Sequence, residues 1–262
     1  MIEVRNVSKS YGEVQVLRDI SFSVKRAESK IILGSNSSGK STLLRLLMGL
    51  EKPDSGEIII DGKDITKLSE WELIKFRKNK SIVFQEGALF DSLTIRDNVG
   101  FKLYDEGWDE EEVDEIVFKL LQFVGLEHTI DMYPSELSGG MKRRVAIARA
   151  MAGEPNVIFY DDPTAGLDPV TSRTICDLIV KLRDIEGVTS VVVTHDLSVA
   201  YFISNFMALV NDEGMISLRE QSEDFCFINS SFLMLKDGKV IFDGSEKALK
   251  KCEDPFVREF IS

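Results

Sequence analysis

The chain has 262 residues, which is enough for one large domain or two small ones with a sizeable core. Hydrophobic residues make up 44% and charged residues 29%, which excludes disordered, collagen-like and low-complexity chains. The net charge of -12 argues against sequence-independent binding of nucleic acid, because the phosphate backbone needs a basic surface. We therefore expect a folded, acidic protein with no nucleic-acid partner.

The cysteines and the apolar segments indicate in which cellular compartment the protein is found. The three cysteines have neither metal-ligand spacing nor the pattern of a disulfide framework, which fits a reducing compartment: Cys176, Cys226 and Cys252. Residues 1–5 lack the apolar segment of a secretory signal, and no apolar run approaches the roughly 18–20 residues that span a bilayer. These features predict a cytoplasmic location.

Short β-branched segments alternate with helical patterns along the chain. Residues 29–33 predict a buried strand, and residues 42–48 predict a helix whose leucines point inward: Leu43, Leu44, Leu46 and Leu47. Residues 157–160 and 191–193 are further candidates for buried strands. This alternation predicts an α/β fold around a mainly parallel sheet.

A helical stretch interrupts this pattern. Its apolar residues recur at the spacing of one helix face: Val113, Ile116, Val117, Leu120, Leu121 and Val124. A second helix is predicted from Gly139 to Ala152, and Gly153 and Pro155 end it. Residues of about 86–155 therefore predict a helical insertion. Because no long linker divides the chain, we expect one domain over residues 1–262.

A glycine- and serine-rich turn joins the strand of residues 29–33 to the helix that follows. It matches G-x-x-x-x-G-K-[ST] as Gly34-Ser35-Asn36-Ser37-Ser38-Gly39-Lys40-Ser41. In such a loop, backbone N–H groups and the positive end of the helix dipole face the phosphates. Lys40 is expected to neutralise the β and γ oxygens, and the Ser41 hydroxyl to bind Mg²⁺. The turn predicts a nucleotide site.

Asp161 ends the apolar strand of residues 157–160 and predicts a second magnesium ligand. An ordinary acid at the end of a strand is the alternative interpretation. The guanine-selecting N-K-x-D motif is absent from the chain, which favours ATP over GTP.

A second motif, Leu137-Ser138-Gly139-Gly140-Met141, resembles the signature of ABC (ATP-binding cassette) ATPases, and the resemblance covers essentially the whole chain. It implies a P-loop (RecA-like) ABC ATPase core with an N-terminal antiparallel β part and an inserted helical subdomain. It also implies ATP hydrolysis coupled to transport, with ATP and Mg²⁺ as cofactors. Residues 34–42, including Thr42, would hold the phosphates.

The same resemblance assigns roles to residues that would individually suggest little. Tyr11 would stack on adenine, Gln85 would be the catalytic and magnesium-binding residue of the Q-loop, and Asp168 would belong to the D-loop. Asp162 stands at the position of the catalytic glutamate, and His195 at that of the switch histidine, which would contact the γ-phosphate. Without this context, each would more readily be a core or solvated residue.

The signature itself has the electrostatics of an anion site. Ser138 and the N–H groups of Gly139 and Gly140 open a predicted helix, where the dipole favours negative charge. The family resemblance implies that they serve the ATP held by a second copy. Two copies would then pack head-to-tail around two Mg-ATP, docked on a polytopic membrane permease.

A narrower resemblance concerns the transported substrate. Residues 86–99, Met141 in place of the usual Gln, and residues 254–260 resemble the ATPase of Mla/Mce-type phospholipid transporters. This implies a peripheral protein at the cytoplasmic face of the inner membrane, with an Mce-type lipid-binding protein as a further partner. The alternative is that the apolar residues after Gln85 simply form core: Ala88, Leu89, Phe90 and Leu93.

Some positions depart from the family pattern. Ser37 and Ala27 replace usual glycines, and Asp162 is one methylene shorter than glutamate, which predicts tight binding and slow hydrolysis. Residues of about 211–231 are extra, and their acidic composition predicts a solvated surface appendage.

Other functions remain open at this stage. One is an ABC importer or exporter for another substrate, one is a slow-hydrolysing non-transport ABC ATPase, and one is a catalytically impaired regulatory cassette. The single cassette, the absence of sustained heptads and the acidic charge favour the transporter.

Overall fold

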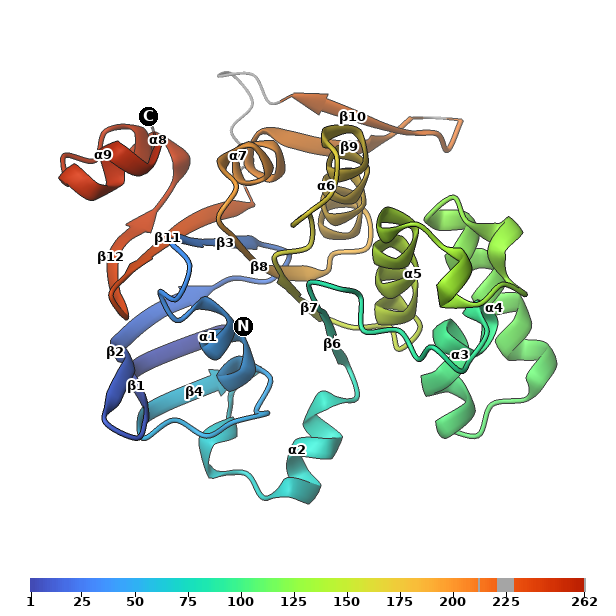
Figure 1. The fold of residues 1–262 in the computed structure, drawn as a ribbon, viewed down its shortest axis with the longest axis horizontal. Coiled ribbons are helices and arrows are strands. Elements are labelled where there is room, and N and C mark those ends of the chain that lie inside the picture. Colours follow the sequence, from blue (N-terminus) through green and yellow to red (C-terminus); the bar gives the residue numbers. More distant parts are fainter. Residues whose placement is uncertain (212, 221–228, 262) are drawn as a thin grey trace.

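The computed structural model describes residues 1–211, 213–220 and 229–261. Cys226 and part of the extra segment 211–231 lie outside the described residues. The elements follow the α/β alternation expected from the sequence, with an antiparallel sheet first and a block of helices in the middle (Figure 1).

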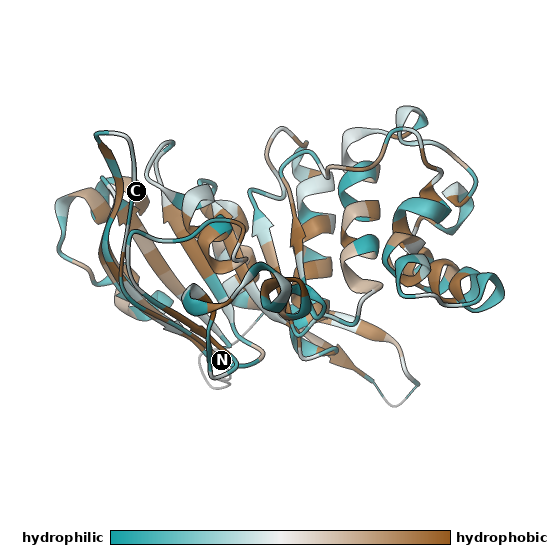
Figure 2. Ribbon diagram, turned by 90° about the horizontal axis from the view of Figure 1, so that it is seen from below, coloured by the Kyte–Doolittle hydropathy of each residue, from teal (hydrophilic) through white to brown (hydrophobic). Residues whose placement is uncertain are grey.

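A central sheet has the strand order β12-β11-β3-β8-β7-β6. Its members are β3 (Ser29–Gly34), β6 (Lys80–Val83), β7 (Val157–Asp161), β8 (Thr189–Thr194), β11 (Ser230–Lys236) and β12 (Lys239–Gly244). All neighbouring strands pair in parallel except β12, which runs antiparallel to β11. Every residue of β3 and β8 is buried, as the continuous apolar pattern of a covered parallel sheet requires. Figure 2 shows hydrophobic residues concentrated on strands in the interior of the molecule.

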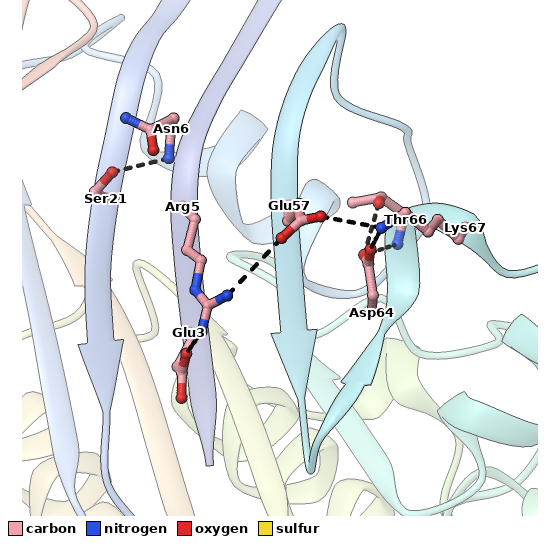
Figure 3. A network of polar contacts seen from close by, with 8 residues as sticks. All are labelled: Glu3, Arg5, Asn6, Ser21, Glu57, Asp64, Thr66 and Lys67. Atoms are coloured by element: carbon pink, nitrogen blue, oxygen red, sulfur yellow. Dashed lines mark hydrogen bonds and ion pairs between the residues drawn. The ribbon is translucent and has the colours of Figure 1, made fainter.

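A second, antiparallel sheet has the order β2-β1-β4-β5. It comprises β1 (Ile2–Tyr11), β2 (Val14–Val24), β4 (Ser55–Ile60) and β5 (Lys63–Asp64). The leucine-rich face of α1 (Lys40–Leu47) shares one apolar core with both sheets. Polar side chains link β4 to β5. Lys67, which follows β5, forms ion pairs with Asp64 of β5 at 2.7 Å and with Glu57 of β4 at 3.0 Å (Figure 3).

Short helices continue the antiparallel part. The 3₁₀ turn η1 (Ile65–Lys67) leads into α2 (Glu70–Arg77), which lies at the bottom of Figure 1. Ser69 and Glu72 form a capping box at the start of α2, and Leu73 and Phe76 are its buried residues.

The helices between β6 and β7 are α3 (Ile95–Asp105), α4 (Glu110–Phe123) and α5 (Gly139–Met151), with the 3₁₀ turns η2 (Glu127–Thr129) and η3 (Pro134–Glu136). In α4, the residues Val113, Val117 and Leu121 are buried, so the helical period of the sequence identifies its inner face correctly. The start of α5 at Gly139 also agrees with the prediction.

The remaining elements surround the other strands. They are α6 (Pro169–Asp184), α7 (Leu197–Asn205), β9 (Phe206–Val210), β10 (Ile216–Glu220), α8 (Glu246–Lys250) and α9 (Pro255–Ile261). β9 and β10 form a separate hairpin, and four residues of β10 are exposed. Within the described part of the chain, no helix combines the length and apolar character that crossing a membrane demands.

The sheet topology brings three functional segments to one edge. The phosphate loop follows β3, Asp162 follows β7 and His195 follows β8, and these strands are parallel neighbours. Since the carboxyl ends of parallel strands meet at one edge, residues far apart in the sequence converge there.

Candidate active site

The phosphate loop is closed by a glycine in the left-handed region. Gly39 has φ 99° and stands at the N-cap of α1. A Cβ on Gly39 would lie 2.6 Å from Leu17 Cδ2 and 3.0 Å from the Val16 carbonyl oxygen, so a larger residue would be strained and displace β2. The loop thereby starts α1 directly at Lys40, two residues before the predicted start.

Lys40 is the buried cation of this site. Its side chain donates hydrogen bonds to the carbonyl oxygens of Gly34 and Ser35, both at 2.8 Å. The residue is 8% exposed, and this burial lowers the pKa of its ammonium group, while the charges of Asp162 and Asp161 oppose the shift. A phosphate would supply the anionic partner that such a cation lacks.

Lys40 opens onto a pocket of about 320 Å³. The lining includes Asn36, Ser37, Gly39, Lys40, Ser41, Thr42, Gln85, Asp161 and Asp162, together with Val16 and Val193. The structure therefore brings together residues from the phosphate loop, the Q-loop and the end of β7, as the sequence analysis anticipated from motif order.

Ser41 and Asp161 face each other across the two elements. The Ser41 hydroxyl donates to Asp161 Oδ1 at 2.9 Å. Burial raises the pKa of the Asp161 carboxyl, the hydrogen bond from Ser41 opposes the shift, and the charge of Asp162 adds to it. Hydroxyl and carboxylate oxygens are hard ligands suited to Mg²⁺, so this pair fits the predicted cation.

Two further observations fit an anionic ligand. Ser38 Oγ is buried and has no hydrogen-bond partner among the described residues. The first turn of α1 contains no acidic side chain, so its positive dipole end is left for a ligand. The residues present thus suit the phosphate groups of a nucleotide with Mg²⁺.

Asp162 lines this pocket and contacts His195, which is not itself among the lining residues. His195 Nδ1 lies 2.6 Å from Asp162 Oδ2, and the Thr194 hydroxyl donates to Asp162 Oδ1 at 3.2 Å. Asp162 has φ 47°, and its N–H donates to the Val193 carbonyl oxygen at 2.9 Å. A left-handed backbone at a non-glycine residue is uncommon and is enriched at functional sites.

The segment after Gln85 is fixed by an arginine that belongs to none of the sequence motifs. Arg149 of α5 donates to the carbonyl oxygens of Gly87 and Ala88, both at 2.8 Å. Its guanidinium also lies 5.7 Å from the ring centroid of Phe90. The sequence places this arginine within the predicted helix of residues 139–152, but it does not show which distant residues the side chain contacts.

The signature motif lies apart from this pocket. Ser138 caps α5 and accepts a hydrogen bond from the Met141 N–H at 3.3 Å, but Ser138, Gly139 and Gly140 are not among the lining residues. A Cβ on Gly140 would lie 2.2 Å from Thr171 Cγ2, so any larger residue here would have to displace the Thr171 side chain of α6.

The D-loop is tied to the signature helix. Asp168 caps α6 by accepting from the N–H groups of Val170 and Thr171, both at 3.0 Å. These bonds lower the pKa of the Asp168 carboxyl, with the Thr171 hydroxyl as the largest cause. Arg143 of α5, also missed in the sequence, donates to the Ala165 carbonyl oxygen at 3.1 Å.

Tyr11 lies at the end of β1 and outside the pocket lining. Its hydroxyl donates to Glu51, and the residue is 44% exposed. An exposed ring on this side remains compatible with stacking on a base, but its role stays a prediction.

The two glycine replacements occupy left-handed backbone. Ser37 has φ 65° and Ala27 has φ 52°. Each such position costs an L-residue on the order of 1–2 kcal/mol, which explains why glycine is usual there.

Comparison with known proteins agrees with this geometry. Residues 17–165, more than half of the chain, match the family model described as ABC transporter, so the chain belongs to the ABC transporter family. It is an ATPase of the ATP-binding cassette type.

The curated relatives include transporters of two substrates. Over 225 residues, 86% of this chain and 71% of the relative, the chain is 42% identical to the methionine import ATP-binding protein MetN of Clostridium tetani. Over 218 residues, 83% of each chain, it is 38% identical to the intermembrane phospholipid transport system ATP-binding protein MlaF of Haemophilus influenzae. The Mla type is therefore not singled out.

Solved structures confirm the predicted fold class. The dimeric bacterial ABC transporter cassette MJ0796 has a TM-score of 0.79 and 34% identity, covering 94% of this chain and 98% of that one. The same cassette in a post-hydrolysis dimer bound to ADP and Pi has a TM-score of 0.78 and 34% identity, at the same coverage.

Proposed function

We propose that this chain hydrolyses ATP as one half of a head-to-tail dimer and thereby powers a polytopic permease at the cytoplasmic face of the inner membrane. One observation carries the proposal: six residues of the phosphate-binding segment 34–42 line the pocket around Lys40 together with Asp161 and Asp162, whereas no residue of the signature motif does. A second copy would supply the missing signature. The dimeric state of the similar cassette MJ0796 supports this arrangement.

In this proposal each residue has one task. Lys40 and the N–H groups of residues 34–42 bind the phosphates, while Ser41, Gln85 and Asp161 would hold Mg²⁺. Bound Mg²⁺ would supply charge neutralisation of the β- and γ-phosphates. Asp162 orients the attacking water, and His195 holds Asp162 through the 2.6 Å contact.

Further residues would complete the binding site at the two ends of the nucleotide, the adenine and the γ-phosphate. Tyr11 stacks on the adenine, and Ser138 with the N–H groups of Gly139 and Gly140 binds the γ-phosphate held by the other copy. Asp168 keeps its D-loop in place by capping α6. The unit is one nucleotide-binding domain over residues 1–262, with a helical subdomain at about 86–155 and an extra segment at about 211–231.

The permease would dock beside the Q-loop. Phe90 and Phe101 are 44% and 46% exposed, and their ring centroids lie 4.8 Å apart. Leu89 packs against the core instead, so the core alternative applies to Leu89 and not to Phe90. We call the exposed pair Phe90–Phe101 the aromatic docking site.

Phospholipid is the proposed substrate. The support is the Mla-like segment 86–99, Met141 in the signature and the 38% identity to MlaF. Methionine is the second candidate, since identity to MetN of Clostridium tetani reaches 42%. An Mce-type partner stays a prediction of the narrower resemblance.

The test is purification of the complex from native membranes with its permease. Its ATPase activity is then measured with added phospholipid or L-methionine, and bound lipid is identified by mass spectrometry. Stimulation by phospholipid together with co-purified lipid supports the first candidate. Stimulation by L-methionine alone replaces it with the second, and the absence of any permease rejects the transporter assignment.

A further inference from the structure

Helix α2 exposes an apolar and cationic face. Trp71 is 78% exposed and Ile74 is 49% exposed, whereas the buried residues Leu73 and Phe76 occupy the opposite side. Residues three, four and seven positions after Trp71 share its face, so Lys75 and Lys78 flank the apolar pair. Tryptophan is enriched at membrane–water interfaces, and lysine can keep its charged end in water while its stem covers apolar surface.

A cleft of about 510 Å³ runs beside this face, between the β4–β5 turn and α2. Four lysines line it: Lys63, Lys75, Lys78 and Lys80. Its floor contains Ile60, Leu68 and Phe76. The cleft therefore offers several ammonium groups above an apolar base.

The two acids of the cleft are already engaged. Asp61 Oδ2 accepts hydrogen bonds from Lys80 Nζ at 3.3 Å and from Asn156 Nδ2 at 3.0 Å. Glu72 Oε2 accepts from the N–H and the hydroxyl of Ser69 at 2.8 and 2.6 Å. Lys80 Nζ also donates to Asn79 Oδ1 at 2.7 Å, and the residue is buried, so Lys80 is already partnered within the fold and the exposed cations of the cleft are its other lysines.

The local charge has the opposite sign to that of the whole chain. Residues 61–80 contain six Lys or Arg and four Asp or Glu, a net charge of +2, in a chain of net charge -12. Hydrogen bonds from Ser69 lower the pKa of the Glu72 carboxyl, and the nearby charges of Lys75 and Lys63 lower it further without forming an ion pair within 4.0 Å among the described residues. This surface is complementary to an anionic partner.

The position of α2 in the fold bears on which anionic partner this surface would contact. Lys102 of α3 donates to the Lys78 carbonyl oxygen, and Lys78 Nζ lies 3.8 Å from Glu106. Lys102 lies in α3, which also carries Phe101, so this bond ties the end of α2 to the helix of the aromatic docking site. In Figure 1, α2 lies at the bottom, while α8, α9 and the β9–β10 hairpin lie at the other end of the molecule.

We propose that α2 and the adjacent cleft contact the anionic phospholipid headgroups of the membrane that holds the permease. The lysines pair with lipid phosphates, and Trp71 and Ile74 enter the headgroup layer. Only the orientation towards the bilayer rests on the proposed function, since the charge and exposure of α2 are properties of the chain alone.

The experiment measures binding of the full chain to vesicles without permease or ATP. The probes are vesicles of phosphatidylcholine alone and vesicles of equimolar phosphatidylcholine and phosphatidylglycerol, assayed by co-sedimentation. Each lysine near an anionic surface contributes about five-fold to partitioning. Binding to the anionic vesicles should therefore exceed binding to the neutral ones at least ten-fold, and should fall when the salt is raised to about 0.5 M.

Matched variants locate the contact. The pair Lys75→Gln and Lys78→Gln should lower binding about ten-fold or more, because two cations are lost. The control pair Lys119→Gln and Lys251→Gln removes the same charge from exposed positions on α4 and after α8, and should leave binding within about two-fold. Circular dichroism verifies that each variant remains folded.

Fluorescence tests the depth of insertion. The chain has two tryptophans, so Trp108→Phe leaves Trp71 as the single reporter. Its emission should shift to shorter wavelength with anionic vesicles and stay unchanged with neutral ones.

Equal binding to both kinds of vesicle, or equal losses in the test and control pairs, would overturn the proposal. So would a Lys75→Gln/Lys78→Gln variant that binds vesicles normally but loses the permease, since α2 would then contact protein. A chain that binds vesicles but recovers no permease would refute the proposed function and leave this contact standing.

Discussion

Asp162 and His195 are 33 positions apart in the sequence, yet their side chains meet at 2.6 Å across the ends of β7 and β8. Thr194 takes the other carboxylate oxygen of Asp162 at 3.2 Å. Both oxygens are therefore held at the sheet edge, one by the last residue of β8 and the other by the residue that follows it. A glutamate at this position would carry its carboxylate further into the pocket.

The first prediction follows from that reach. The added methylene in Asp162→Glu extends the carboxylate by roughly 1.3–1.5 Å, and a misplacement of about 1 Å can cost on the order of a hundred-fold in rate. We expect kcat to rise at least ten-fold at unchanged KM, measured as steady-state ATPase of the complex with its permease. Equal or lower turnover would mean that the pocket is built around the shorter acid.

The second prediction concerns the dimer. In an Asp162→Asn background that blocks turnover, Mg-ATP should convert monomer to dimer in light scattering. Adding Ser138→Arg should abolish this shift, because the arginine would occupy the place of the second copy's γ-phosphate, while ATP binding by the monomer persists. Ser217→Arg, at an exposed position on β10, is the control and should still dimerise. Loss of ATP binding in the Ser138 variant would contradict its assigned role.

The third prediction tests the aromatic docking site. Phe90→Asp should weaken co-purification of the permease about thirty-fold, since a buried apolar anchor contributes about 2 kcal/mol or more. Phe118→Asp on α4 is the matched control, because Phe118 is 47% exposed on the same group of helices. Unfolding of the Phe90 variant would instead support a core role.

The fourth prediction concerns Cys176. Burial raises the pKa of its thiol from 9.0 to about 12, so it should resist thiol reagents in the folded protein and react after unfolding, as read by peptide mass spectrometry. Because the folded-state pKa is the higher one, this stabilisation is complete below about pH 9 and is lost as the pH rises towards 12. The free energy of unfolding of the wild type should fall more steeply in that range than that of Cys176→Ala, by up to about 1.4 kcal/mol per pH unit. If the free energy of unfolding fell equally steeply with pH in the two proteins, the raised pKa of Cys176 would be contradicted.

The parts of the molecule that were predictable depend on local pattern. The phosphate loop was found because its glycines, lysine and serine must stand at fixed spacing, and the inner face of α4 because burial follows the helical period. The remaining candidate residues were assigned through the family resemblance, because the sequence around a single residue such as His195 does not by itself indicate a function.

What escaped prediction depends on contacts between distant segments. Arg149 fixes the loop after Gln85 from 61 and 62 positions away, and no periodicity encodes that pairing. The β9–β10 hairpin was missed for a different reason: it pairs Val210 with Ile216, which are close in the sequence, but β9 is apolar throughout and lacks the alternation of a half-buried strand. The sequence predicted which motifs form the site around Lys40 and Asp162. The distances between their side chains follow from the order of the strands in the sheet, which the sequence does not show.

The separation of Ser138 from the Lys40 pocket has a genetic consequence. In the proposed dimer, a copy with Lys40→Ala and a copy with Ser138→Arg damage the same composite site and leave the other one complete. Two inactive alleles would then restore a transporter with one working site when produced together, whereas either allele alone gives none. Such complementation between alleles is what a shared site permits and a self-contained one forbids.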